Sequence, residues 1–253
     1  EGIDKMKKIV MKIVGIELLL IFFYVANGAY VSIQQPSNPF WQFAILIPLA
    51  IALVLYITAK KKWRHYFFIP INIGNIFVYL PLIFVLCIIL FGTKGLNFDS
   101  ISDLLLMFFM QMFVVAFIEE TVFRGILLRL LLSKGTFTAI SLSSILFGVT
   151  HALQLIGGQS LEDTVIQIIY ALLVGLVLSL LIIDGQSIIL TITFHGFNNF
   201  FNFMGNAESS MLTAYLIIIV LFVYLLFLWR RVKKKASVQS LRSSSPLHDF
   251  NRS

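Results

Sequence analysis

The sequence predicts an all-α fold, a polytopic membrane helical bundle of eight transmembrane helices. Two observations carry this prediction. The 253 residues are 59% hydrophobic with a mean hydropathy of +0.95, whereas a typical soluble domain is about half apolar and about a quarter charged. Only 12% of the residues are charged, and they cluster between long apolar runs. Long apolar runs separated by short charged loops are typical of proteins that cross a lipid bilayer several times.

Each span is predicted from a run of about 20 apolar residues. Polar stretches interrupt the runs in the first half, namely "QQPSNP", "KKKWRH" and "GTKGLNFD". The later break "DGQS" is so short that the helices on either side should be antiparallel neighbours. The first apolar run is too long for a signal peptide, so we expect a retained span. The eight predicted spans are 9–33, 40–59, 69–92, 103–124, 137–155, 162–183, 187–204 and 210–229.

The basic residues predict the orientation, because Lys and Arg stay on the cytoplasmic side. With the N-terminus in the cytoplasm and eight spans, only Lys94 of the 19 basic residues falls in an outside loop. We therefore expect both termini in the cytoplasm, one membrane domain over residues 1–235, and a disordered cytoplasmic tail over 236–253. The Lys-, Ile-, Phe- and Asn-rich composition favours a bacterial plasma membrane.

The composition also excludes some classes of function. The net charge of +7 does not indicate nucleic-acid binding, because the basic residues flank apolar segments and form no stripe on a soluble face. Cys87 is the one cysteine and lies in an apolar segment, so an intrachain disulfide is excluded. The expected partners are the lipid bilayer and a membrane-anchored peptide or protein substrate.

Ionisable side chains within the spans are the candidates for function, since each costs about 2.5–3.5 kcal/mol on insertion scales. Glu17 lies near the cytoplasmic end of the first span, where a snorkelling carboxylate is the simpler interpretation. The full set is Glu17, Glu119, Glu120, Arg124, His151 and His195, with Asn198, Asn199 and Asn202 as neutral companions.

The two adjacent glutamates should differ in role. Glu120 and Arg124 are four residues apart on a helix, so they can form an ion pair on one face. Glu119 points about 140° away from Arg124 and cannot share that pair directly. We therefore predict a structural or orienting Glu120 and a reactive Glu119. The alternative is that both carboxylates only hold the bundle together.

Two further segments place polar groups on single helical faces. His151 follows Phe147 by four residues, and Asn199 follows His195 by four. A single His in a membrane helix more often hydrogen-bonds a neighbouring helix than takes part in catalysis. Taken together, "EETVFR", "FGVTH" and "HGFNN" resemble the motifs EExxxR, FxxxH and HxxxN of the CPBP family, the intramembrane CAAX-processing and bacteriocin-processing proteases also called the Abi family. The resemblance covers about residues 100–204.

The resemblance implies a glutamate-dependent CAAX-type intramembrane protease that hydrolyses a peptide bond with a Glu-activated water. It implies that Glu119 is the general base and later proton donor, and that His151 helps to hold the water. It further implies that His195 and Asn199 stabilise the oxyanion, while the ion pair of the first motif fixes the helix and aims the base.

No cofactor is expected, although zinc is possible. If a metal is present, its ligands would be His151, His195 and Glu119. The absence of an HExxH spacing and the poor affinity of Asn for zinc favour a metal-independent reaction. The substrate, its cleavage site, its lipidation and the oligomeric state stay open.

Two other functions remain open from the sequence. Intramembrane Glu, Arg and His also form the relays of proton-coupled transporters, but no second copy of the acidic motif is evident. A non-catalytic membrane scaffold or bacteriocin-immunity protein could keep the same fold.

The predicted spans imply that the site is reached from the cytoplasmic half. They also place His151 about 20 Å but His195 only about 12 Å from the cytoplasmic ends of their helices, at 1.5 Å per residue. A fifth helix that begins nearer residues 141–144 would bring the two histidines level.

Overall fold

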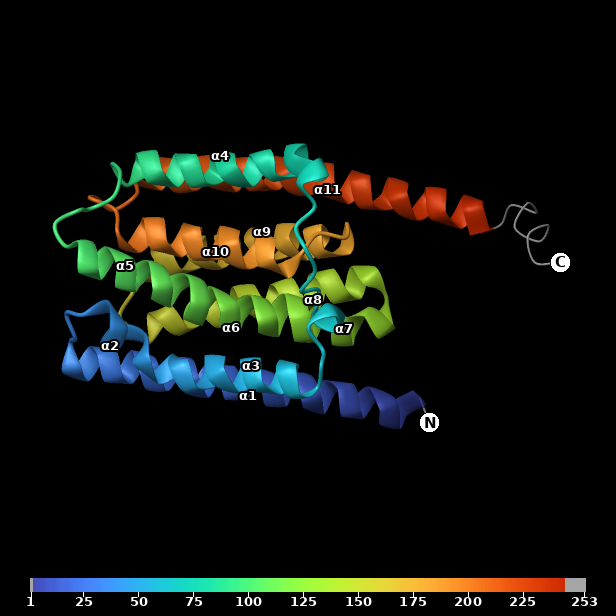
Figure 1. Ribbon diagram of the computed structural model, residues 1–253, viewed down its shortest axis with the longest axis horizontal. Coiled ribbons are helices and arrows are strands. Elements are labelled where there is room, and N and C mark those ends of the chain that lie inside the picture. Colours follow the sequence, from blue (N-terminus) through green and yellow to red (C-terminus); the bar gives the residue numbers. More distant parts are fainter. Residues whose placement is uncertain (1, 244–253) are drawn as a thin grey trace.

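A computed structural model describes residues 2–243 of the chain. Within this range the chain is helical and forms no strand, with an isolated bridge between Leu96 and Gly205. The all-α prediction is therefore confirmed. The helices lie side by side along one bundle axis, and the start of α1 and the end of α11 lie at the same end of the bundle (Figure 1).

Every predicted span corresponds to a helical segment. The elements of the first half are α1 (Gly2–Gln34), α2 (Pro39–Phe43), η1 (Ala44–Leu46), α3 (Ile47–Ala59), η2 (Arg64–Tyr66), η3 (Ile73–Asn75) and α4 (Ile76–Gly92). The elements of the second half are α5 (Ile101–Phe109), η4 (Met110–Val115), α6 (Ala116–Glu120), η5 (Thr121–Leu127), α7 (Leu128–Leu131), η6 (Leu132–Lys134), α8 (Thr136–Thr150), η7 (His151–Leu155), α9 (Leu161–Ile183), α10 (Ile188–Phe203) and α11 (Met211–Ser243).

Six of these segments are long and apolar enough to cross a membrane. The six are Met6–Gln34, Pro39–Ala59, Ile101–Lys134, Thr136–Leu155, Leu161–Ile183 and Met211–Val238. The two others are shorter: α4 has 17 residues and α10 has 16. The protein is thus an integral multi-pass membrane protein, while the count of eight spans and the cytoplasmic side of the termini stay predictions.

Large apolar side chains cover the outside of the bundle. Phe77 and Phe91 on α4 are 80% and 82% exposed, and Phe22 on α1 is 65% exposed. A soluble protein rarely leaves so much apolar surface in contiguous patches. In a bilayer these side chains face acyl chains, and the helices satisfy their own backbone hydrogen bonds.

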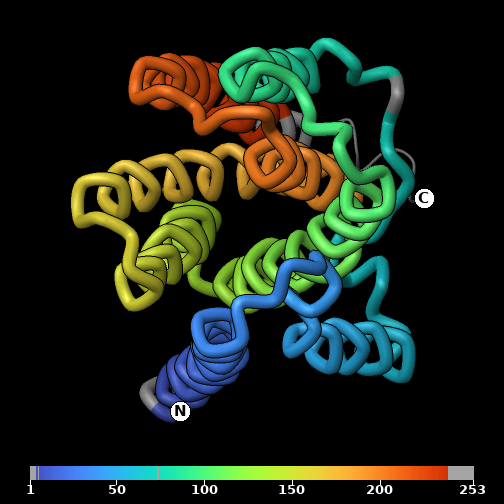
Figure 2. Tube along the Cα trace, turned by 90° about the vertical axis from the view of Figure 1, so that its left-hand side faces the viewer, coloured from blue at the N-terminus to red at the C-terminus, as the bar shows by residue number. Residues whose placement is uncertain are grey.

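Viewed along the bundle, α1 and α3 lie on one side and α4 and α11 on the opposite side (Figure 2). The segment from α5 to η6 runs between these two groups, and α8, α9 and α10 pack with it. The polar residues singled out in the sequence come from α6, η5, η7 and α10, so they converge in the middle of the molecule.

One predicted helix boundary was wrong, because the fourth span does not end at residue 124 but continues to Lys134. The predicted fifth span, 137–155, agrees with the helical segment Thr136–Leu155, whereas the alternative start near residues 141–144 is not observed. Gly135 joins the two helices in one residue, with a φ of +105° that favours glycine. This one-residue turn explains why the sequence showed no polar loop there.

Two further boundaries differ. The predicted third span starts at residue 69, but η3 and α4 begin only at Ile73 and Ile76. The tail was expected to be disordered from residue 236, yet α11 continues to Ser243. Residues 244–253 lie outside the described part of the chain.

The structure resolves the difference in depth between the two histidines. Glu119 lies 16 residues before Gly135 and His151 lies 16 residues after it, so the two are level. The start of α10 is deeper in the bundle, because the amide of Ile188 donates to Phe67 O and its Cδ1 lies 3.5 Å from an added Cβ at Gly125. Because α10 starts at this greater depth, His195, seven residues after Ile188, lies at the same depth as Glu119 and His151.

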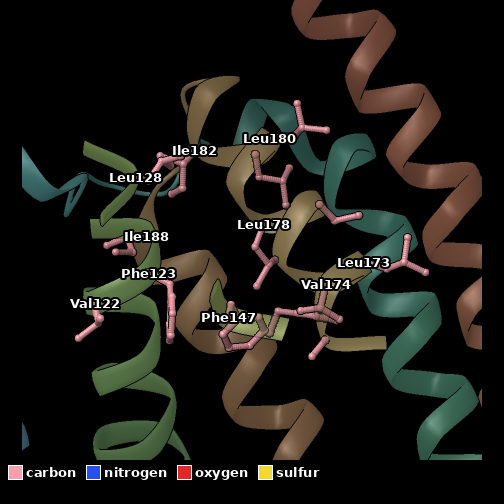
Figure 3. Packing of buried hydrophobic residues seen from close by; sticks show 14 of the residues in the cluster. Val122, Phe123, Leu128, Phe147, Leu173, Val174, Leu178, Leu180, Ile182 and Ile188 are labelled. Atoms are coloured by element: carbon pink, nitrogen blue, oxygen red, sulfur yellow. The ribbon is translucent and has the colours of Figure 1, made fainter. Parts of the chain in front are cut away.

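The core around the site is tightly packed. Phe147 of α8 lies among Phe123 of η5 and Val174 and Leu178 of α9 (Figure 3). α8 and α9 approach so closely at Gly175 that an added Cβ would lie 3.0 Å from Ser144 Cβ and 3.1 Å from its Cα. Small residues at such crossings let membrane helices pack backbone to backbone.

A second polar cluster holds the turn between α9 and α10. The buried Asp184 carboxylate pairs with Arg231 Nε at 3.0 Å and Lys235 Nζ at 2.5 Å, both from α11. Gln186 also donates to Asp184 at 3.0 Å and accepts from Tyr79 of α4 at 2.7 Å. The turn between α9 and α10 is therefore fixed to α4 and α11.

Gly175→Ala should destabilise the bundle, because its Cβ would press on the backbone of Ser144. Overpacking of this kind costs about 1–3 kcal/mol. The measurement is thermal unfolding in detergent, where we expect a lower midpoint for Gly175→Ala. Gly28→Ala on α1, where no atom lies within 4 Å of the added Cβ, is the matched control and should unfold at or above the wild-type temperature. Equal midpoints for both variants would contradict the close crossing.

The orientation is testable by cysteine labelling in intact cells. Cys87→Ser gives a cysteine-free background, to which Lys61→Cys or Asp99→Cys is added. An impermeant maleimide should label Asp99→Cys directly and Lys61→Cys only after lysis, because the Lys-rich loop is predicted inside. The reverse pattern would overturn the predicted orientation.

Candidate active site

The segment that carries the two glutamates is irregular. Two π-helical turns, η4 and η5, flank the short helix α6, whose last two residues are Glu119 and Glu120. π-turns inside helices are rare and occur frequently at functional sites, because they change the direction in which side chains point. No sequence pattern predicted these turns.

Glu120 and Arg124 form the predicted ion pair. Glu120 Oε1 lies 2.9 Å from Arg124 Nη1, and both side chains are at most 1% exposed. The guanidinium carbon also lies 4.0 Å from the ring centroid of Phe147, in the geometry of a cation–π contact. Arg124 is thus held by a carboxylate of its own helix and by the aromatic residue of the second motif.

His195 connects the two glutamates. Its Nδ1 lies 2.9 Å from Glu120 Oε1, and its Nε2 lies 3.5 Å from Glu119 Oε2. Because the carboxylate of Glu120 accepts, this bond requires the proton on Nδ1. Nε2 is therefore the ring nitrogen directed at Glu119.

Glu119 does not pair with Arg124, as the helical spacing predicted. Its Oε1 accepts a hydrogen bond of 2.6 Å from the hydroxyl of Tyr24 on α1. Its Oε2 is buried and has no hydrogen-bond partner within the described chain. The two glutamates thus have different surroundings, and one oxygen of Glu119 is left without a hydrogen bond.

His151 is near Glu119 and His195, but its hydrogen bond is to the backbone of its own helical segment. Its Nδ1 lies 2.9 Å from the carbonyl of Phe147, one turn earlier. The ring of Phe147 packs edge-on against His151 at 4.9 Å and against His195 at 5.7 Å. Phe147 therefore separates the two histidines and holds both rings in place.

Asn199 belongs to a network of amides beside the site. Its Nδ2 donates to Oε1 of the fully buried Gln111 at 3.2 Å. Its Oδ1 accepts from Asn198 at 3.2 Å, and Asn198 Oδ1 in turn accepts from the hydroxyl of Tyr170. Asn202 donates to the carbonyl of Asn198 at 2.8 Å, one turn earlier on α10. These bonds tie α10 to η4 and α9.

A cavity of about 40 Å³ is lined by residues of the second and third motifs, while Glu119 is not among its lining residues. A volume of about 10–15 Å³ on this measure is enough for one water molecule. Its polar lining includes His151, His195, Asn198 and Asn199, and Phe147 and Phe194 are among its apolar walls. The cavity is therefore large enough for a reacting water and polar enough to hold one.

The structure leaves metal binding as an open prediction. Among residues 2–243, no group of three His, Cys, Asp or Glu side chains is placed to hold a metal ion. Nδ1 of His195 is engaged by Glu120 and Nδ1 of His151 by a carbonyl, and Nε2 of His195 lies 3.5 Å from Glu119 Oε2.

Two site residues were not predicted. Gln111 interrupts the apolar run "LLLMFFMQMFVV", so a buried amide could have been noted. Tyr24 had no such signal, because a Tyr within an apolar span is common near membrane interfaces. The unpaired Glu17, by contrast, is far along α1 from these contacts and takes no part in them.

Comparison with known proteins agrees with the motifs. Residues 101–201 match a family model described as type II CAAX prenyl endopeptidase Rce1-like. No curated protein and no solved structure matches the chain significantly. The matched stretch contains Glu119, Glu120, Arg124, both buried histidines and Asn199. Residues 101–201 are therefore similar to the domain of the Rce1-like type II CAAX prenyl endopeptidases, in agreement with the CPBP resemblance of the three motifs.

Proposed function

We propose that the protein is an intramembrane endopeptidase in which Glu119 activates the attacking water. The family supports endopeptidase activity within a membrane. The observation that carries the glutamate mechanism is the asymmetry of the two carboxylates. Glu120 Oε1 pairs with both Arg124 and His195, whereas Glu119 makes no ion pair with Arg124 and directs its Oε2 at His195 Nε2, 3.5 Å away. One oxygen of each carboxylate has no hydrogen-bond partner in the described chain.

The reaction begins with water between Glu119 and the peptide carbonyl. Glu119 takes one proton as the water oxygen bonds to the carbonyl carbon, which gives a tetrahedral oxyanion. The C–N bond then breaks, and Glu119 returns the proton to the leaving nitrogen. Water has then been added across the peptide bond, and the carboxylate is restored.

Two donors can stabilise the oxyanion. His195 is one of them: its Nδ1–H is donated to Glu120, so a proton on Nε2 would be presented to the oxyanion on the side of Glu119. The amide nitrogen of Asn199 carries two hydrogens, and Gln111 takes one of them.

His151 would hold the attacking water from the other wall of the cavity. Its Nδ1 is occupied by the carbonyl of Phe147, so Nε2 is the nitrogen that can contact the water. The expected substrate is a peptide or protein anchored at the membrane, and approach from the cytoplasmic half stays a prediction.

The alternatives are less well supported. A scaffold does not require a polar cavity inside the bundle that is lined by two histidines and two asparagines. A proton-coupled transporter would need a polar route across the bundle, whereas Glu120 and Arg124 are sealed from solvent by the core.

Glu119→Gln should keep the fold and abolish cleavage, because an amide keeps the shape but cannot take the water proton. We expect at least a 100-fold loss of kcat, in the range of general-base removal of about 10²–10⁴. The measurement uses purified protein in detergent, a library of membrane-anchored peptides, and mass spectrometry. Glu162→Gln, in the first turn of α9, is the matched control and should cleave normally.

The same assay with and without a chelator tests metal dependence. We expect cleavage to survive chelation. Loss of wild-type cleavage in chelator, restored by zinc, would contradict the metal-free reaction. Equal cleavage by wild type and Glu119→Gln would show that Glu119 is not the base.

Glu120 and Arg124 should affect folding more than chemistry. Glu120→Ala leaves the guanidinium of Arg124 buried and unpaired, which costs about 3–5 kcal/mol. The double variant Glu120→Leu with Arg124→Met removes both charges and should recover much of the loss. Thermal unfolding in detergent compares the two. A double variant less stable than Glu120→Ala would mean that the pair is not the dominant contact of either residue.

A further inference from the structure

Outside the stretch that matches the family model, α1 contributes one group to the site. The hydroxyl of Tyr24 donates to Glu119 Oε1 at 2.6 Å, across 95 residues of sequence. A hydrogen bond to a charged oxygen is shorter and stronger than one between neutral groups. The motifs contain no residue that takes this place.

The rest of α1 is loosely attached to the bundle. In the most apolar 18-residue stretch of α1, only 11% of the residues are buried within the protein. Leu20 packs into the core one turn before Tyr24, and Asn27 donates to the carbonyl of Gln42, on the next helix along the chain. Among the described residues, the bond from Tyr24 to Glu119 is the one side-chain hydrogen bond that joins α1 to the segment from α5 to η6.

The geometry of this bond distinguishes the two carboxylate oxygens. Oε1 is occupied by Tyr24, while Oε2 lies 3.5 Å from His195 Nε2 and has no hydrogen-bond partner in the described range. A carboxylate held at one oxygen has its plane fixed, and the second oxygen is then aimed in one direction. General-base catalysis depends on such alignment, because the proton must be within hydrogen-bond reach.

We propose that Tyr24 is a positioning residue for Glu119. Its hydroxyl holds Oε1, so that Oε2 takes the proton of the water. This inference rests on the proposed function of Glu119 as the base. This role makes α1 part of the active site, although α1 ends far before the first motif in the sequence.

A mere tether between helices would behave differently. Loss of a tether lowers stability and alters substrate binding, whereas loss of a positioning contact lowers kcat and leaves KM nearly unchanged. Removing one hydrogen bond to a charged group corresponds to about a 10- to 100-fold change. The two roles are therefore separable by kinetics.

The test compares Tyr24→Phe with Tyr30→Phe, a half-buried tyrosine on the same helix. Both changes keep the ring and remove one hydroxyl. We expect Tyr24→Phe to lower kcat about 10- to 100-fold with KM within about threefold, and Tyr30→Phe to match the wild type. A fall shared equally by both variants, or a change confined to KM or to the unfolding temperature, would overturn the positioning role.

A second readout does not depend on cleavage. An apolar carbodiimide modifies buried carboxyl groups, and mass spectrometry gives its rate at Glu119 relative to Glu17 in the same chain. Without the hydroxyl on Oε1, we expect Glu119 to be modified faster in Tyr24→Phe than in wild type or Tyr30→Phe. Equal rates in all three would refute the contact. If no peptide is cleaved by the wild type, the proposed function fails, and this rate still decides whether Tyr24 holds Glu119.

Discussion

The buried pair of Glu120 and Arg124 is the interaction on which the rest of the site depends. Neither side chain is more than 1% exposed, so each charge needs the other. Breaking a buried pair is far more damaging than replacing it with apolar residues, because the remaining charge has no solvent. Glu120 also binds His195, so the same carboxylate fixes a helix and sets which nitrogen of the histidine points at Glu119. The carboxylate of the ion pair thus holds Nδ1–H of His195 and leaves Nε2 as the nitrogen that faces Glu119.

Backbone features place this pair among helices that are distant in sequence. The π-turns η4 and η5 surround α6 and bring Gln111, Glu119 and Arg124 toward α8, α9 and α10. Gly196 lets α10 approach η4 so closely that an added Cβ would lie 3.0 Å from Met112 Cα. Because His195 precedes this glycine, the close approach is what brings its ring to the two glutamates. The chemistry therefore relies on main-chain geometry as much as on the motif side chains.

The helical fold and the grouping of the motif residues could both be predicted from the sequence, because both depend on strong local signals. Apolar runs of membrane length and charged residues inside them are visible without a structure. Spacing along one helix correctly separated Glu119 from the Glu120–Arg124 pair. What could not be predicted arises between segments. The contact of Tyr24 with Glu119 depends on how α1 docks, and the level of His195 depends on a deep start of α10 beside Gly125. The one-residue turn at Gly135 was hidden because it needs no polar loop.

The clamp on Asp184 shows that the stretch recognisable by sequence is smaller than the unit that folds. Residues 101–201 contain the buried carboxylate of Asp184, but its two cationic partners, Arg231 and Lys235, come from α11. At the other side, Tyr24 of α1 completes the surroundings of Glu119. A protein cut to the matched stretch would carry all three motifs together with a charge that has lost its partners. The outer helices α1 and α11 thus each supply a polar contact to the matched stretch, one at Glu119 and the other at the turn between α9 and α10.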